Sequence, residues 1–171
     1  VASHPIAGTE NSGPTAAFST LFENKVAIIC EKEHSSDYAI DMVEQMYRLL
    51  NMRLLYMTPE EHDRHLAYVS HLSHITSFTL GLTVLEIEKD EKNIFNLAGS
   101  GFASTARLAK SSPDMWAPIF EQNSENLVKT LDAYIKNLEE FKHIIENNDK
   151  EKAYTLMKRA NKIRSILDGI K

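Results

Sequence analysis

Hydrophobic and polar residues along the first sixty positions predict a strand, a helix and a second strand. The run Val26-Ala27-Ile28-Ile29-Cys30 is apolar and β-prone, as in a strand covered on both faces. Ser35-Ser36-Asp37 supplies a helix N-cap, and apolar residues then recur at helical spacing: Ile40, Val43, Tyr47 and Leu50. Residues 54–57 form a second candidate strand. A lone unit of this kind leaves sheet edges uncovered, so we expect it to pack against more sheet than this chain contains.

From residue 58 the spacing of apolar residues becomes helical. Thr58-Pro59-Glu60-Glu61 is a strong helix start, with threonine as N-cap, proline at the first helical position and glutamate at the third. The segment to about Glu88 is apolar on most sides in its second half, which predicts a central helix enclosed by others. Residues 96–104 contain two glycines and several small residues, and they predict a loop.

The last third of the chain predicts two helices with apolar seams. Ser112-Pro113-Asp114 marks a helix start, and Pro118 is expected either to kink this helix or to mark its true start. A first seam, at alternating spacings of four and three, comprises Leu127, Leu131, Tyr134, Leu138, Phe141 and Ile145. After Asn147-Asn148, a second seam along a final helix comprises Ala153, Leu156, Ala160, Ile163, Leu167 and Ile170. These seams pair either with each other or with another copy of the chain.

Composition narrows the class of protein. The chain has 171 residues, 43% of them hydrophobic and 25% charged, which suits a globular domain with a real core. The net charge of −5 and the lack of a dense Lys/Arg run argue against nucleic acid as a partner. The single cysteine, Cys30, fits a reducing compartment, so we expect a cytoplasmic protein. The sequence shows neither a signal peptide nor a membrane-spanning stretch.

Two histidine pairs invite a metal-site interpretation that the sequence does not support. His62 and His65, and again His71 and His74, lie three residues apart and so share a helix face. There is no His-Glu-x-x-His pattern, and the one carboxylate four residues from a histidine, Glu61, is explained by capping. We therefore predict no metal site. Hydrolase motifs such as Gly-x-Ser-x-Gly are also absent.

Gly99-Ser100-Gly101 resembles the start of a dinucleotide-binding loop but does not complete one. The third glycine position is Ser104, and the segment follows a helix where such a loop requires a strand. One alternative is that its backbone amides approach an anion while Arg107 holds a carboxylate. The other is an ordinary turn between helices, with Arg107 in a surface ion pair. Trp116, the only tryptophan, is most simply a core or interface residue.

Taken together, several motifs resemble prephenate dehydrogenases in order and spacing. The resemblance covers nearly the whole chain up to the last helices, and it is carried by His4-Pro5-Ile6-Ala7-Gly8-Thr9-Glu10, Pro59-Glu60-Glu61-His62-Asp63, Ser70-His71-Leu72-Ser73-His74, Gly99-Ser100-Gly101-Phe102, Arg107-Leu108-Ala109-Lys110-Ser111 and Trp116.

The resemblance implies a mainly α-helical fold of two parts. Residues 1–57 would be the C-terminal remnant of a Rossmann-like nucleotide-binding domain, a residual strand-helix-strand. Residues 58–171 would be a helical substrate-binding and dimerisation domain. The implied activity is oxidative decarboxylation of prephenate to 4-hydroxyphenylpyruvate in tyrosine biosynthesis, with hydride transfer to NAD or NADP. The main cofactor site is expected upstream of Val1, so we expect this chain alone to have negligible activity.

The resemblance also assigns roles to individual residues. His4 matches the catalytic histidine, which would accept the proton of the substrate's ring hydroxyl. Substrate-binding roles fall on Thr9, His62, Ser70, His74, Arg107 and Trp116, the last near the pocket entrance or the subunit contact. On one straight helix His62 and His74 would lie about 18 Å apart. His62 is therefore expected on the cofactor side or at a neighbouring subunit's site. Because residue 104 is serine, the ion-pair partner of Arg107 stays open.

Two other interpretations remain open. One is a helical interaction module without catalytic activity that dimerises or senses a ligand such as tyrosine, which resembles the reaction product. The other is an arogenate dehydrogenase, whose substrate has an ammonium group where prephenate has a keto group. The absence of an obvious acid beside His74 favours the keto substrate. In each case we expect a homodimer.

Overall fold

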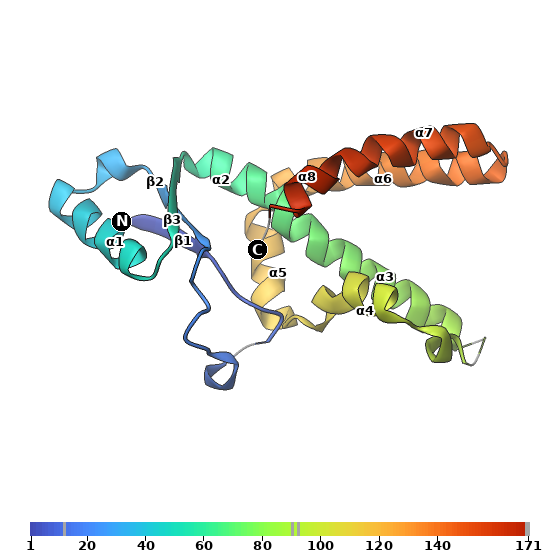
Figure 1. Ribbon diagram of the computed structural model, residues 1–171, viewed down its shortest axis with the longest axis horizontal. Coiled ribbons are helices and arrows are strands. Elements are labelled where there is room, and N and C mark those ends of the chain that lie inside the picture. The colour runs from blue at the N-terminus through green and yellow to red at the C-terminus, as the bar shows by residue number, and fades with distance from the viewer. Residues whose placement is uncertain (12, 90, 92, 170–171) are drawn as a thin grey trace. The chain divides into compact units, whose positions relative to one another are not determined.

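A three-stranded sheet begins a mainly helical chain, coloured blue to green in Figure 1. The structure, a computed structural model, describes residues 1–11, 13–89, 91 and 93–169. Packing divides the chain into two compact units, Val1–Leu127 and Val128–Lys171. The sheet and the central helix belong to the first unit.

The sheet contains β1 (Ala2–Ile6), β2 (Val26–Cys30) and β3 (Arg53–Met57) in that order. β2 and β3 are parallel and are connected by helix α1 (Asp37–Leu49), which confirms the predicted strand-helix-strand. β1 pairs antiparallel with β2 and was missed. Its sequence, Ala-Ser-His-Pro-Ile, lacks the alternation of a half-buried strand, and only its last two residues are partly buried. Pro5 is tolerated in it because a strand with one free edge need not donate every backbone N–H.

The first unit is centred on β2, whose residues Ala27 and Ile29 are almost fully buried. On one side, Ala27 forms a core cluster with Tyr47 of α1 and Met52. The Tyr47 hydroxyl hydrogen-bonds the Ser3 hydroxyl of β1 at 2.9 Å. Because successive strand residues face opposite sides of a sheet, the next residue, His4, faces away from α1. The sheet therefore presents His4 to the helices that follow β3.

Local capping explains where the early helices begin. Ser36 Oγ accepts a hydrogen bond from the backbone N–H of Ala39 at 3.3 Å, as the predicted cap of α1 requires. Helix α2 (Pro59–Leu66) opens with the predicted capping box. Thr58 Oγ1 accepts from the Glu61 N–H at 3.2 Å, and the Glu61 carboxylate accepts from the Thr58 N–H at 3.0 Å.

The predicted helix from residue 58 to about residue 88 is confirmed but is interrupted by a wider turn. Its second half is not enclosed by other helices within the single chain, because Leu82, Leu85 and Ile87 are 47% to 60% exposed. After α2, residues Ala67–His71 form a π-helical turn that leads into α3 (Leu72–Glu88). The spacing of apolar residues does not predict this turn. A π-helical turn contains one more residue than a turn of α-helix, and such turns often occur at functional sites. Here it falls between His62 and His74, so the straight-helix spacing assumed for them does not apply.

The predicted loop at residues 96–104 is wrong in part, because helix α4 (Ser100–Ala106) begins inside it. The 3-10 turns Ile94–Leu97 and Arg107–Lys110 flank this helix. Small residues allow the segment to pack closely on α3: Ser77 Oγ donates to the Thr105 carbonyl at 2.7 Å. A Cβ atom placed on Gly81 would lie 3.6 Å from the Ala109 Cβ. This packing fixes the turn that carries Arg107.

Helix α5 (Pro113–Gln122) runs through Pro118 and starts five residues before it, so the idea that Pro118 marks the helix start is wrong. Ser112 occupies the N-cap position as predicted, although its side chain makes no capping hydrogen bond. Helix α6 (Ser124–Glu146) follows and continues into the second unit.

The second unit is a helical hairpin. α6 and α7 (Lys150–Ala160) lie side by side (Figure 1), and Arg159 of α7 forms an ion pair with Glu140 of α6 at 3.8 Å. Leu156 of the second seam is buried, and so is Ile144, which lies beside the first seam rather than in it. Leu138 and Ile145 of the first seam are 50% and 69% exposed, so pairing of the two seams stays a prediction. The predicted final helix is broken by a 3-10 turn, Asn161–Ile163, before α8 (Arg164–Leu167). Ile170 of the second seam lies outside the described residues.

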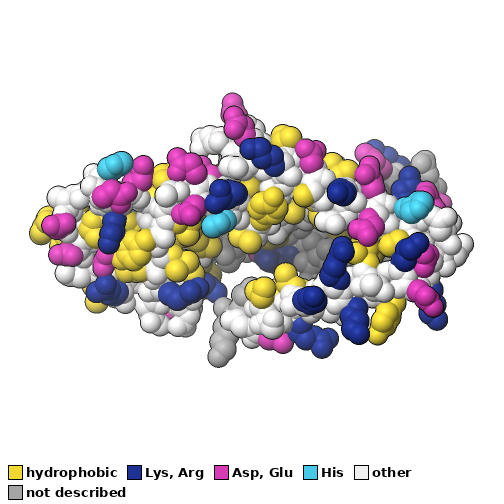
Figure 2. Space-filling view, turned by 90° about the horizontal axis from the view of Figure 1, so that it is seen from above, with side chains coloured by type: hydrophobic (Ala, Val, Ile, Leu, Met, Phe, Trp, Pro, Cys, Tyr) yellow, Lys and Arg dark blue, Asp and Glu magenta, His cyan; other side chains and the backbone are white. Residues whose placement is uncertain are grey.

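The charged side chains on the surface are mixed in sign, as expected from a sequence without a dense Lys/Arg run. On the face shown in Figure 2, positive and negative side chains are interspersed with hydrophobic ones, and the described residues there form no broad area of one charge. Among the helices that the structure describes, none is both long enough and apolar enough to cross a membrane.

Candidate active site

His4 lies at one end of a hydrogen-bonded row of polar side chains. Its Nδ1 is 2.9 Å from Nε2 of His62 on α2, and the two ring centroids are 5.2 Å apart. Nδ1 of His62 lies 2.8 Å from Oδ1 of Asp63. The structure thus brings His62 directly to His4. Asp63 was quoted in a motif but was not singled out by the sequence.

The surroundings of His4 favour the neutral imidazole. Partial burial lowers the pKa of His4 below its ordinary value of 6.5, and the neighbouring His62 lowers it further. The side chain nevertheless retains exposed surface, so a ligand can reach it. A neutral imidazole has one unprotonated nitrogen at neutral pH and can accept a proton there.

Arg107 forms an ion pair with Glu10. This identifies the partner of Arg107, which the sequence had left open. An Arg107 Nη atom contacts a Glu10 carboxylate oxygen at 2.5 Å, although Arg107 remains half exposed. The pKa of Glu10 is lowered, first by a hydrogen bond from its own backbone N–H; burial opposes this, and the hydrogen bond and charge of Arg107 lower the pKa further. Glu10 follows His4 by six residues, so this pair ties the segment after β1 to the turn after α4.

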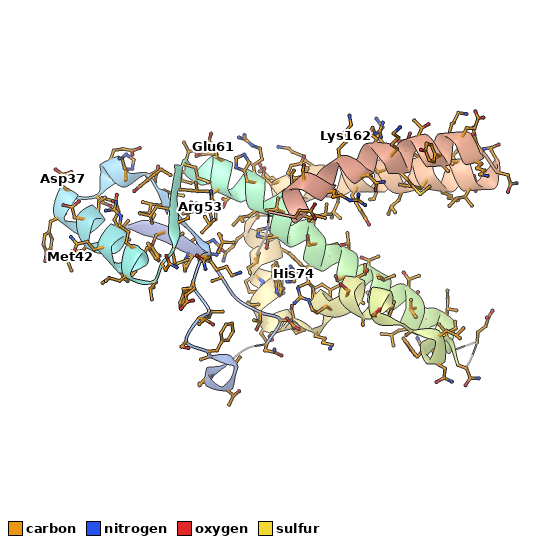
Figure 3. The ribbon with its side chains drawn as sticks, viewed as in Figure 1. Asp37, Met42, Arg53, Glu61, His74 and Lys162 are labelled. Atoms are coloured by element: carbon orange, nitrogen blue, oxygen red, sulfur yellow. The ribbon has the colours of Figure 1, made fainter. Side chains whose placement is uncertain are left out.

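His74 and Trp116 form the second half of the site. His74 projects from α3 toward α5 (Figure 3), and its ring stacks on Trp116 with centroids 3.5 Å apart and planes 25° apart. Its Nδ1–H donates to the Ser70 carbonyl at 3.0 Å, which leaves Nε2 as an acceptor. Burial lowers the pKa of His74; the Ser70 hydrogen bond opposes this, and the charge of Arg107 adds to it. His74 therefore lies within the electrostatic influence of Arg107.

Trp116 is buried, with 6% of its surface exposed, and it also contacts Phe120. Within the described part of the chain its indole N–H has no hydrogen-bond acceptor. A buried N–H without an acceptor costs free energy, about 1–3 kcal/mol, unless a ligand or water supplies one. The indole is thus a spare donor beside His74.

Asn123, which the sequence did not single out, and His71 complete the network. The side-chain amide of Asn123, at the junction of α5 and α6, donates to the Asp63 carbonyl at 2.8 Å and lies 3.2 Å from His71 Nδ1. His71 is buried and packs edge-on against Trp116. Burial lowers its pKa, and His74, His62 and His4 lower it further while Asp63 opposes them. The only sequence signal for His71 was its place in a histidine pair.

The remaining predicted site residues are placed as follows. Ser70 lies in the π-helical turn and contributes its carbonyl to His74. Thr9 is exposed between His4 and Glu10, and its hydroxyl accepts from the Asn11 N–H at 3.2 Å. Over residues 1–11, 13–89, 91 and 93–169, no three His, Cys, Asp or Glu side chains are arranged to hold a metal ion.

One surface hollow is lined by none of these site residues. It has a volume of about 610 Å³ and is in the helical hairpin, lined by Phe141, Tyr154, Met157, Lys158, Ala160 and Asn161. None of these residues is a histidine or a carboxylate. We therefore base the candidate site on the histidine cluster and on the Arg107–Glu10 pair rather than on this hollow.

Comparisons with known proteins show the family to which the chain is similar. Residues 1–56 match the family model described as prephenate dehydrogenase, nucleotide-binding domain, and residues 58–159 match prephenate dehydrogenase, dimerization domain. A cyclohexadienyl dehydrogenase of Zymomonas mobilis is 32% identical over 98% of this chain and 57% of its own length.

Two solved structures are similar over most of this chain. The crystal structure of prephenate dehydrogenase from Aquifex aeolicus in complex with hydroxyphenyl propionate and NAD⁺ has a TM-score of 0.86 and 32% identity, covering 96% of this chain and 58% of that one. The crystal structure of Synechocystis arogenate dehydrogenase has a TM-score of 0.75 and 25% identity, covering 96% and 60%. This chain thus spans 57% to 60% of the length of these three relatives.

Proposed function

Because this chain belongs to the prephenate dehydrogenase family, we propose that the protein oxidises and decarboxylates prephenate to 4-hydroxyphenylpyruvate, with a nicotinamide dinucleotide as the hydride acceptor. Two observations carry this proposal. His4, whose pKa is lowered, forms a hydrogen-bonded row with His62 and Asp63, and Arg107 is tied to the segment that follows His4 through its ion pair with Glu10. The Aquifex aeolicus relative, whose complex contains hydroxyphenyl propionate and NAD⁺, supports both a phenolic acid ligand and the cofactor class.

His4 is the proposed catalytic base. Loss of hydride from the ring carbon bearing the hydroxyl becomes easier as the hydroxyl proton is withdrawn. An imidazole whose pKa lies below 6.5 is unprotonated at neutral pH and can accept that proton. Loss of carbon dioxide then makes the ring aromatic.

Arg107 is the proposed carboxylate-binding residue. Prephenate has two carboxylates, and a planar guanidinium can hold one of them by two parallel hydrogen bonds. Glu10 occupies the same guanidinium in this structure, so a bound ligand carboxylate would share or replace that contact. The nearby Nε2 of His74 and the spare indole N–H of Trp116 would complete the polar lining, with Thr9 and Ser70 at its margin.

The turn from β2 into α1 does not fit the phosphates of a dinucleotide. The turn from β2 into α1 is Glu31–Ser36, which contains no glycine and carries two glutamates where a phosphate loop offers backbone N–H groups. We therefore assign no cofactor-binding residue here and derive no step through the cofactor. On this basis we propose that the 171-residue chain by itself has negligible dehydrogenase activity, and that the choice between NAD and NADP is made elsewhere in the protein.

The charge around His74 favours prephenate over arogenate. The guanidinium of Arg107 disfavours a proton on His74, and it would disfavour an ammonium group nearby for the same reason. The similarity to an arogenate dehydrogenase makes arogenate the second candidate. Its ammonium group would require the Glu10 carboxylate, which Arg107 already neutralises.

We also propose that the helical part forms a homodimer. The family model matching residues 58–159 describes a dimerization domain, and several apolar side chains of α6 are exposed in the single chain.

The two family models together support a functional division between residues 57 and 58, with a nucleotide-binding part followed by a substrate-binding part. Packing within the chain groups these residues differently, with its boundary inside α6.

The test is turnover by the full-length protein with each substrate and each cofactor. We expect prephenate to be oxidised with a kcat/KM at least tenfold above that for arogenate, in order-of-magnitude terms. Calorimetric titration with prephenate, arogenate and tyrosine would complement this assay. Binding of tyrosine without turnover of either substrate would identify a ligand-sensing module and overturn the proposal.

A further inference from the structure

We propose that Asp63 is a positioning residue that acts through His62 to set the tautomer of His4, keeping Nε2 of His4 free to accept the substrate proton. This inference rests on the proposed role of His4 as the base. It assigns functions to two side chains of α2, and it gives His62 a place in proton transfer rather than in substrate binding.

The hydrogen-bond geometry fixes the protons one by one. An ionised carboxylate can only accept, so His62 must carry its proton on Nδ1, 2.8 Å from Asp63. A neutral His62 is then unprotonated at Nε2 and must accept from His4 at 2.9 Å. The proton of neutral His4 is therefore on Nδ1, and its Nε2 holds a free lone pair.

The same row can accept the charge that forms during the reaction. When Nε2 of His4 takes the hydroxyl proton, the proton on Nδ1 can move to Nε2 of His62. His4 is then neutral again, and the positive charge is on His62 beside the Asp63 carboxylate, a favourable ion pair. One proton enters at Nε2 and one leaves from Nδ1, so the exchange is balanced. The Asp63 side chain is 52% exposed, which gives the proton a route to water.

The backbone at Asp63 is held from a second direction. Its carbonyl accepts from the buried Asn123 side chain at 2.8 Å, and Asn123 Oδ1 in turn accepts from Asn126 at 2.8 Å. Because the Asp63 carbonyl is an acceptor only, the amide group of Asn123 must face it. Together with the capping box at the start of α2, where Glu61 is labelled in Figure 3, this contact fixes the helix that presents His62 and Asp63.

Other titratable groups near this row are few. His71 interacts electrostatically with His4, His62 and Asp63, and Cys30 at the end of β2 is influenced by Asp63 and Glu60. Burial keeps His71 neutral at neutral pH, and burial together with these carboxylates raises the pKa of the Cys30 thiol, so both groups are uncharged there. The tautomers of His4 and His62 are thus governed by Asp63.

Nitrogen NMR of the full-length protein with ¹⁵N-labelled histidine tests the tautomers directly, without any substrate. At neutral pH we expect His4 and His62 each to carry the proton on Nδ1. In Asp63→Asn the side-chain amide can donate to His62, so both rings should switch to the Nε2-protonated form. The control is Glu60→Gln, which removes an exposed carboxylate from the same helix and should leave both tautomers unchanged. Nε2-protonated His4 in the parent protein, or no switch in Asp63→Asn, would overturn the proposal.

Steady-state kinetics tests the consequence. Asp63→Asn should lower kcat by about 100-fold, within the range of a general base, while KM stays within about twofold. Asp63→Glu, which keeps a carboxylate, should recover part of this loss. The acid limb of the kcat profile should also move to lower pH in Asp63→Asn, because the protonated histidine pair loses its counter-charge. A uniform loss of kcat at all pH values would indicate a merely structural role and count against the proposal.

The two tests separate this inference from the proposed function. If the parent protein shows the expected tautomers but does not turn over prephenate, the proposed function fails and the positioning role of Asp63 stands as a structural fact. If prephenate is oxidised and Asp63→Asn is as active as Glu60→Gln, the function stands and the positioning role is overturned.

Discussion

Arg107 and Glu10 form an ion pair across 97 positions of sequence, and this contact joins the segment that carries His4 to the turn packed on α3. The guanidinium is half exposed, whereas the Glu10 side chain is only 19% exposed. A ligand carboxylate that approaches from solvent therefore meets the arginine first. Glu10 holds the guanidinium in place and also competes with the ligand carboxylate for it.

We predict that Arg107→Ala raises KM for prephenate by about 10- to 100-fold, since a hydrogen bond to a charged group contributes about 1.5–3 kcal/mol. kcat should change much less, because the side chain acts mainly in binding. Lys110→Ala is the matched control: it removes an exposed cation from the same 3-10 turn, one that makes no contact with Glu10 as close as that of Arg107. Steady-state kinetics on both variants measures this. A larger effect of Lys110→Ala would contradict the assignment.

The partner of Arg107 could not be deduced from sequence for a physical reason. Local signals were sufficient for the caps at Ser36 and Thr58, because each cap is made within three residues along the chain. The ion pair of Arg107 depends on how a turn packs against α3 and on where the segment after β1 runs, and neither is encoded locally. Because residue 104 is serine, the sequence near it named no partner for Arg107.

For His62, too, local sequence signals predicted the helix but not the contact that its side chain makes. The helix itself was correctly predicted from its capping box and apolar spacing, but the π-helical turn at residues 67–71 was not. Strand β1 was missed as well, because its residues have little burial to impose alternation. Without β1 there was no reason to bring His4 to α2. Both residues were thus named as candidates from the sequence, whereas their contact was not predicted.

We predict that His4→Asn lowers kcat by about 10²- to 10⁴-fold with little change in KM, as expected for loss of a general base. The pH dependence follows from the lowered pKa of His4: the base stays unprotonated as pH falls through 6.5 and is protonated only below it. The acid limb of kcat/KM should therefore lie below pH 6.5. His4 interacts electrostatically with His62 and His71. The pH at which the acid limb falls therefore reports the histidine cluster as a whole rather than His4 alone. An acid limb above pH 6.5 would contradict the assignment.

Stability should fall in mild acid because three histidines have lowered pKa values in the folded protein: His4, His71 and His74. The unfolded chain binds more protons than the folded chain once pH drops below about 6.5. Stability is thus complete above that pH, declines below it, and stops declining below the folded-state pKa values. Urea unfolding at pH 7.5 and pH 5.5 should show a lower midpoint at pH 5.5.

The contribution of His71 to this effect can be isolated. His71 is the most buried of the three, and its ring accepts from Asn123. His71→Gln can keep that acceptor but cannot be protonated, so it should reduce the difference between the two midpoints. His65→Gln, at an exposed position on α2, is the control and should leave the difference unchanged. Equal pH dependence in the His71 variant and the parent protein would refute this explanation.

The proposed dimer makes a prediction about one face of α6. Four of its apolar side chains are 48% to 69% exposed in the single chain, at spacings of seven, three and seven: Val128, Ile135, Leu138 and Ile145. These are the a and d positions of a heptad, which normally face a partner helix. The opposite face already packs inside the chain, since Ile144 is buried. A second copy of the chain is the partner that would cover the exposed face.

We expect the full-length protein to sediment as a dimer at micromolar concentration and the double variant Leu138→Glu, Ile145→Glu to sediment as a monomer. Burying two carboxylates in an apolar contact costs several kcal/mol, enough to dissociate a dimer of ordinary affinity. Both positions are exposed in the monomer, so helical circular dichroism should be retained. Asn137→Glu adds a similar charge beside Leu138 but off the stripe, and should remain dimeric. A monomeric parent protein, or a double variant that stays dimeric, would show that this face is not the interface.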